Sequence, residues 1–153
     1  MNPTPATPAP SAARWRFDHI NLQARDSAPL KALFGDVMGL RPGYRPPFPF
    51  PGDWLYRDDQ AWLHLVTAPP EQGAAVRFAH IAFRTDEPAA ALLDRVRSTG
   101  LEHEVAVVPE ENCVQIFVRL PGGLVIELDA DGAPADAADG RYDSRLALAQ
   151  SPE

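Results

Sequence analysis

A repeat within the chain constrains its fold more than any other feature. The four residues FDHI at 17–20 return as FAHI at 78–81, an offset of 61 residues. Three aligned pairs make the offset concrete: His19 with His80, Gly39 with Gly100, and Leu40 with Leu101. A repeated supersecondary unit cannot bury its apolar face alone, so its copies are expected to pack together. The sequence therefore predicts a duplicated module.

Each copy has the pattern of a strand, a helix and further strands. Alternating apolar residues indicate strands, and apolar residues at helical spacing indicate helices. In the first copy we expect a strand at 16–22, a helix at 28–38, an extended proline-rich segment at 41–53, and a hairpin of strands at 54–57 and 61–66. In the second copy we expect a strand at 76–83, a helix at 87–98, and strands at 104–108, 114–119 and 124–128. The predicted fold class is α+β, with two tandem βαβββ modules.

Composition separates this duplicated domain from two tails. Residues 1–13 are rich in proline and alanine and carry no charge, which is typical of a disordered tail. Residues 131–153 hold five acidic and two basic side chains and are expected to form a flexible acidic tail. The domain is expected at 14–130, with module 1 at about 14–68 and module 2 at about 75–130.

Charge and hydropathy exclude several classes of partner. The formal charge of −7 and the pI near 5.0 disfavour nucleic acids and anionic membranes. No stretch approaches the roughly 18 apolar residues of a membrane span. The single cysteine, Cys113, allows no intrachain disulfide, which fits a reducing compartment. We therefore expect a cytoplasmic protein that acts on a small molecule.

Four potential metal ligands occupy equivalent places in the two copies. His19 and His80 lie in the first strands, while His64 and Glu127 lie in the last strands, 63 residues apart. A charged Glu127 in an otherwise apolar strand costs several kcal/mol unless it is paired or bound to metal. A single strand histidine is more often a packing residue, but the concerted placement favours a metal site. Three imidazoles and a carboxylate suit Zn, Ni, Co, Mn or Fe(II).

These residues and their order resemble the vicinal oxygen chelate superfamily, which includes glyoxalase I, bleomycin-resistance proteins and extradiol dioxygenases. The matching segments are FDHINL, WLHLV, FAHIAF and LPGGLVIELDA, within residues 16–130. The resemblance implies that the modules form a curved mixed sheet, a cup around one divalent metal ion held by His19, His64, His80 and Glu127. It also implies a homodimer in which modules pair at the interface, although the two halves of a cup can also come from one chain.

The resemblance leaves several functions open. Our first expectation is a glyoxalase I-like lyase or isomerase that acts on a small metal-chelating oxygenated substrate, with Glu127 and His64 as catalytic residues and Glu127 moving the proton. Bacterial glyoxalase I has a glutamate at the position of His64, so here the site has one negative ligand fewer. The first alternative is a single-domain Fe(II) extradiol ring-cleaving dioxygenase with His64 as an acid/base or fourth ligand. The others are a metal-free binding protein of the bleomycin-resistance kind and an epoxide-opening enzyme of the fosfomycin-resistance kind.

Substrate-binding candidates lie in and after the proline-rich segment. Tyr44, Arg45 and Trp54 offer aromatic surface and a cation, which suits a lid with a carboxylate or phosphate clamp. The alternative is a stiff connection whose aromatic residues cover the core or a dimer interface. Tyr56 and Arg119 occupy equivalent positions before the hairpin turns and are further candidates, with a plain surface role equally open.

Overall fold

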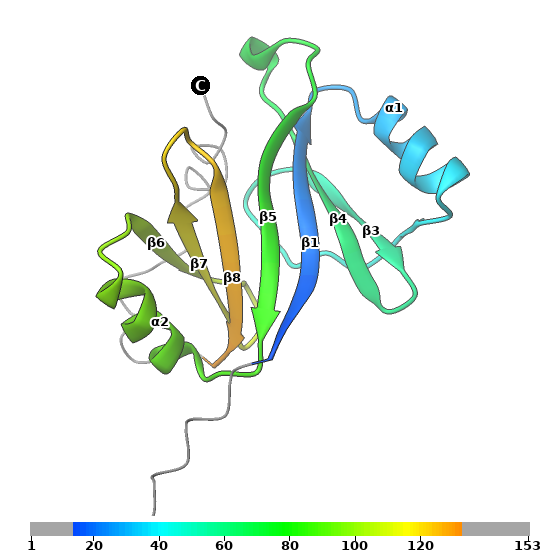
Figure 1. Cartoon of the computed structure of the whole chain (residues 1–153). Coiled ribbons are helices and arrows are strands. Elements are labelled where there is room, and N and C mark those ends of the chain that lie inside the picture. The colour runs from blue at the N-terminus through cyan, green and yellow to red at the C-terminus, as the bar shows by residue number, and fades with distance from the viewer. Residues whose placement is uncertain (1–13, 133–153) are drawn as a thin grey trace, which may run out of the picture.

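The computed structural model describes residues 14–132, which form one eight-stranded sheet with the helical segments at its two sides (Figure 1). The strand order is β2-β3-β4-β1-β5-β8-β7-β6. The first half contains β1 (Trp15–Ala24), α1 (Ala28–Lys31), the π-helix η1 (Ala32–Val37), β2 (Arg41–Pro42), β3 (Gly52–Arg57) and β4 (Gln60–Thr67). The second contains the short η2 (Pro70–Gln72), β5 (Arg77–Thr85), α2 (Ala89–Ser98), β6 (His103–Val107), β7 (Cys113–Arg119) and β8 (Val125–Asp131). The predicted pair of βαβββ modules is confirmed.

The two modules meet within one chain at the antiparallel pair β1 and β5. Ile20 lies opposite Ile81, its own counterpart in the repeat, so an approximate two-fold axis passes between them. Each first strand then pairs in parallel with the last strand of its module, β1 with β4 and β5 with β8. His64 and Glu127, the candidates on the last strands, have the same register. His64 pairs with Asn21, and Glu127 pairs with Ala82, which is the repeat equivalent of Asn21. The 61-residue repeat is therefore a structural symmetry.

The helices and the predicted metal ligands lie on opposite faces of the sheet. Leu92 and Val96 of α2 pack on Ile116 of β7, while Leu30 of α1 packs in a second cluster with Leu63 of β4. Strand side chains alternate between faces, so the neighbours of these apolar residues project to the other side. That other face carries the predicted ligand positions.

Two elements differ from the sequence prediction. The helix expected at 28–38 is one α-helical turn followed by a π-helical segment, with Met38 donating its backbone N–H to the carbonyl of Leu33. Gly35 lies inside this segment and lowers its α-helical propensity. The proline-rich segment contributes a two-residue edge strand, β2, and a sheet edge is where proline is tolerated.

A β-bulge interrupts each central strand at the same place. In β1 the extra residue is Asp18, because Phe17 pairs with Phe83 and His19 with the adjacent Ala82. In β5 the extra residue is Ala79, which precedes His80 just as Asp18 precedes His19. A bulge re-aims the side chains around it. Each bulge therefore adjoins one of the two first-strand histidines.

The remaining predictions on organisation concern the chain ends. The tails expected at 1–13 and 131–153 lie outside the described residues, apart from Asp131, which ends β8, and Gly132, which follows it. Among the helices of residues 14–132, none has the length and apolar character needed to cross a membrane.

Candidate metal centre

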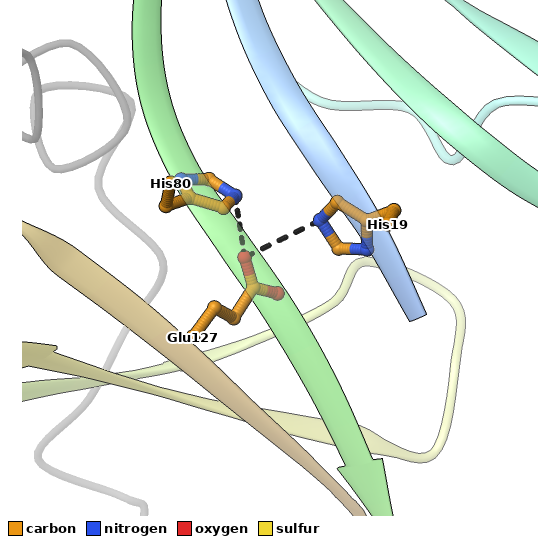
Figure 2. A group of neighbouring side chains, drawn as sticks. All are labelled: His19, His80 and Glu127. Carbon is orange, nitrogen blue, oxygen red and sulfur yellow. Dashed lines mark ion pairs between the residues drawn. The ribbon is translucent and has the colours of Figure 1, made fainter. Parts of the chain in front are cut away.

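Three of the predicted ligands converge at the centre of the open face. Figure 2 shows His19 from β1 and His80 from β5 directed at Glu127 on β8. His80 Nε2 lies 2.6 Å and His19 Nε2 3.5 Å from the same oxygen, Oε2 of Glu127. Ligand atoms of all three side chains lie within 4.8 Å of one another. All three side chains are buried, so their polar atoms depend on each other or on a bound ion.

The β1 bulge gives His19 a supporting carboxylate. His19 Nδ1 donates to Oδ1 of Asp18 at 2.8 Å, although consecutive residues of a regular strand point to opposite faces. Gln60 secures the bulge, since its amide donates to the backbone carbonyls of Phe17 and Asp18. A hydrogen-bonded Nδ1 leaves Nε2 as the ligand atom, the arrangement usual for a metal-bound histidine. His80 follows Ala79 instead, and its Nδ1 is buried with no partner.

One side chain on the same face holds Glu127 in place. Gln115 of β7 donates its amide to Oε1 of Glu127 at 2.5 Å. Asp129 follows Glu127 by two residues on β8 and is also buried. Burial raises the pKa of Asp129 well above its ordinary value, and the negative Glu127 raises it further.

The centre concentrates one negative charge on Glu127. Burial raises its pKa, but His80 and His19 outweigh that effect and keep the net pKa well below the ordinary value. For His19, burial lowers the pKa, whereas Glu127 and Asp18 raise it to about 9. Without a metal, His19 therefore carries the proton that balances the carboxylate. A buried carboxylate that requires a cation is the electrostatic signature of a metal site.

The residues present fit a divalent metal ion. His19 Nε2 is buried and has no hydrogen-bond partner, because its 3.5 Å contact with Glu127 is too long for one. Two imidazoles and one carboxylate are the donor set that Fe(II), Mn, Co, Ni and Zn accept. His19, His80 and Glu127 are hereafter called the triad.

His64, the fourth predicted ligand, does not belong to the triad's group of ligand atoms. Its ring lies between those of Trp54 and His19, with ring centroids 3.7 Å and 3.5 Å away and nearly parallel planes. Burial lowers the pKa of His64 well below the ordinary value, and the neighbouring His19 lowers it further. His64 is therefore a neutral, fixed imidazole beside the triad.

A small, partly open hollow lies over the triad. Its lining includes His64, the amide of Asn21, and the aromatic side chains of Phe48, Phe50, Trp54 and Phe117. Arg45 also lines the hollow, donates to the carbonyl of Phe50 at 2.7 Å, and lies about 5 Å from the rings of Phe48 and Phe50. The segment between β2 and β3 thus brings a cation and two aromatic rings to the site.

The structure separates the five substrate-binding candidates. Arg45 and Trp54 line the hollow over the triad. Tyr56 does not line it, and its hydroxyl donates to the carbonyl of the exposed Tyr44 at 2.7 Å. Arg119 lies at the end of β7, where its guanidinium is 3.6 Å from Glu102. The first two are at the site, and the other three lie outside this hollow.

Sequence reasoning missed three residues that lie close to the triad. Strand alternation places Asp18 on the wrong face, and only the bulge corrects it. Gln115 and Asp129 do follow the alternation, since each is two residues from a site residue, Phe117 and Glu127 respectively. Their polar character in apolar strands was the available signal.

Comparisons with known proteins agree with this geometry. Residues 16–133 match the family model described as the Glyoxalase/Bleomycin resistance protein/Dioxygenase superfamily. Comparison with curated proteins finds no match.

Solved structures share the fold. They include the Mn(II)-bound glyoxalase from Novosphingobium aromaticivorans (TM-score 0.59, 23% identity, 82% of this chain and 43% of that chain). An extradiol ring-cleaving dioxygenase from B. fuscum matches at TM-score 0.59 and 20% identity, over 86% of this chain and 36% of that chain. A catechol 2,3-dioxygenase matches at TM-score 0.57 and 16% identity, over 75% of this chain and 38% of that chain.

The present chain thus spans less than half the length of these structures, and at such identities they show the fold alone. The family model, by contrast, extends over most of the chain and includes every member of the triad. The chain belongs to the Glyoxalase/Bleomycin resistance protein/Dioxygenase superfamily.

Proposed function

We propose that the chain is a mononuclear metal enzyme that cleaves an oxygenated aromatic ring with dioxygen, in the manner of an extradiol dioxygenase. The observation that carries the proposal is the position of His64, beside the triad and outside it. Two histidines and one carboxylate leave metal positions open, which is the donor set of non-haem Fe(II) oxygenases. The neutral fourth imidazole is then available as a base.

The hollow supports a planar substrate. Phe48, Phe50, Trp54 and Phe117 surround it, and aromatic side chains favour contact with a flat ring. Asn21 lines it as well, and its Oδ1 is buried without a partner. An unpartnered buried acceptor favours a ligand that brings a hydroxyl donor.

The chain's own residues would then divide the work as follows. A bound Fe(II), which His19, His80 and Glu127 would hold, would supply Lewis acidity and reactivity toward dioxygen. A ring nitrogen of His64 accepts the proton of a substrate hydroxyl. The low pKa of His64 keeps that nitrogen unprotonated beforehand. Trp54 and His19 hold the imidazole from both sides. The aromatic segment between β2 and β3 excludes water from the ring.

A glyoxalase-type isomerase is the second candidate, with His64 as the base. The neutral His64 could move a proton between two substrate carbons as well as from a hydroxyl. The hydrogen bond from Gln115 to Glu127 favours a fixed carboxylate, which supports His64 rather than Glu127 as the base. A metal-free binding protein is disfavoured, since nothing in such a protein requires a buried Glu127 paired with two histidines.

The test is oxygen consumption. We expect protein loaded anaerobically with Fe(II) to take up oxygen when catechol is added, and Zn(II)-loaded protein not to do so. His64→Gln should lower kcat by about 10²- to 10⁴-fold while metal content stays unchanged. His80→Ala should lose the metal.

The matched control is His103→Gln, because His103 bonds the carbonyl of Leu101 far from the triad. It should leave both kcat and metal content as they are. Isomerisation of a hemithioacetal without oxygen uptake would establish the second candidate instead. Full metal content in His80→Ala would refute the triad. A homodimer remains our expectation, although the triad is complete within one chain.

A further inference from the structure

A second, larger hollow adjoins the first on the same face of the sheet. It is open to solvent and shares four lining residues with the first: His19, Trp54, His64 and Gln115. Asp18 on β1 and Asp129 on β8 also line it, and potential ligand atoms of both lie within 4.8 Å of His19. The proposed function uses only the first hollow, so the second has no role in it.

Two buried oxygen atoms at this hollow lack hydrogen-bond donors. The amide nitrogen of Gln115 donates a hydrogen bond to Glu127, whereas Oε1 of Gln115 has no partner. Asp129 Oδ1 is likewise buried and unpartnered. The exposed fractions of the two residues are only 8% and 3%. An unmet buried acceptor costs roughly 1–3 kcal/mol, so both atoms call for a donor from a ligand.

The charge around the hollow has the sign that suits a cationic donor. Asp18, Asp59 and Glu111 line it with three carboxylates, and Asp18 is already paired with His19, another lining residue. Of the two arginines in the lining, Arg84 is paired with Asp131. The remaining Asp59, Glu111 and Arg16 are all exposed, so two negative charges stand against one positive charge, and solvent screens all three.

We propose that this second hollow binds a primary ammonium group on the side chain of the substrate. The inference rests on the proposed function and narrows it to an oxygenated aromatic ring with an aminoalkyl substituent. The ring occupies the aromatic hollow over the triad, and the ammonium donates to Gln115 Oε1 and Asp129 Oδ1. The carboxylates of Asp59 and Glu111 add long-range attraction.

The experiment compares three ligands that share one ring: catechol has no side chain, dopamine ends in an ammonium, and homoprotocatechuate ends in a carboxylate. We expect Zn(II)-loaded protein, followed by tryptophan fluorescence, to bind dopamine at least tenfold more tightly than catechol. Homoprotocatechuate should bind more weakly than dopamine. The double variant Asp59→Asn/Glu111→Gln should lose roughly tenfold of the dopamine affinity and none of the catechol affinity.

Adjacent residues offer a control with the same change in composition and charge. Asp58 and Glu110 precede the two lining carboxylates, and neither lines the hollow. Asp58→Asn/Glu110→Gln should therefore bind dopamine like the unmodified chain. Equal loss in both double variants would overturn the subsite, as would tighter binding of homoprotocatechuate than of dopamine.

The subsite and the proposed function can fail separately. Oxygen uptake with plain catechol tests the reaction and does not involve the second hollow. If no catechol binds, phenethylamine and phenylacetate test the ammonium preference without metal-chelating oxygens. Tighter binding of phenethylamine, lost only in Asp59→Asn/Glu111→Gln, would support the subsite. Equal binding of the two would refute it.

Discussion

The two triad histidines occupy equivalent positions but have different support. The carboxylate of Asp18 accepts a hydrogen bond from His19. At the equivalent bulge, Ala79 has no polar side chain that could support His80. Supporting carboxylates fix the tautomer and raise the basicity of a ligating imidazole. His19 is therefore the better-defined ligand of the pair.

This asymmetry predicts a graded effect of changes at Asp18 on metal affinity. Asp18→Asn keeps an acceptor for His19 Nδ1 but removes the charge, so we expect metal affinity to fall by about tenfold. Asp18→Ala removes the acceptor and should cost about 100-fold. Competition with a chelating dye measures both. Asp94→Asn, on the exposed face of α2, should change nothing. Equal affinity in all three variants would contradict the supporting role.

At this scale the sequence predicts positions better than contacts. The repeat identifies His19, His64, His80 and Glu127 because equivalent residues of duplicated modules occupy equivalent places. The repeat does not show that His64 lies outside the triad. The position of the His64 ring depends on stacking with Trp54 rather than on the residue pattern of the strand. Bulges are equally hidden, because the residue pattern gives no sign of a one-residue slip.

Among the elements, β3 depends most on a single residue. A Cβ atom on Gly52 would overlap the backbone carbonyl oxygen of Leu65, on the neighbouring strand β4. Backbone atoms cannot move aside without breaking the β3–β4 pairing. Since β3 carries Trp54, which stacks on His64, this close approach also fixes the proposed base.

Two glycine substitutions should therefore have opposite effects on stability. Gly52→Ala should lower the free energy of unfolding by at least about 2 kcal/mol, as overpacking does. Gly35→Ala lies in a helical segment, and its new Cβ would meet an ordinary contact of 3.7 Å with the carbonyl of Leu40. It should raise stability by about 0.5–1 kcal/mol. Urea unfolding measures both, and a neutral Gly52→Ala would show that β3 can shift.

Strands were predicted more faithfully than the first helix because burial of one face imposes alternation directly, while the helix expected at 87–98 corresponds to α2, Ala89–Ser98. The expected strand at 114–119 corresponds to β7, Cys113–Arg119. The first helix has no comparably strong pattern, and the structure turns it into an α turn and a π segment. The edge strand β2 has only two residues, too few to produce any periodicity.

For the whole molecule, the charges at the centre link stability to pH. The pKa of His19 is about 9 in the folded chain, above its ordinary 6.5, because Glu127 and Asp18 outweigh the effect of burial. The folded state thus holds this proton more tightly than the unfolded chain. The resulting stabilisation is complete below pH 6.5 and is lost as the pH rises through 9. The raised pKa of Asp129 acts in the same direction.

We therefore expect metal-free protein to lose about 3 kcal/mol of stability between pH 6.5 and 9. The metal-loaded protein should show the opposite trend, because a metal ion competes with the proton for His19. Urea midpoints across this range, with chelator or with Mn(II), measure both trends. His19→Gln should flatten the metal-free profile. Metal-free protein that becomes more stable toward pH 9 would contradict the charge assignment.

The duplication could be predicted from the sequence, but the way in which the copies join could not. Offsets between residues reveal that two modules exist, whereas β1–β5 pairing within one chain depends on which edges meet in space. The sequence left pairing between chains equally open for this reason. The family match extends over both modules, as a duplicated domain requires.

The pairing of β1 with β5 makes the site a joint product of the two modules. Module 1 supplies His19 together with Phe48, Phe50 and Trp54, while module 2 supplies His80, Glu127 and Phe117. Neither module alone contains the triad or the complete aromatic lining. A change that shifts one module against the other should therefore disturb metal binding and substrate contact together.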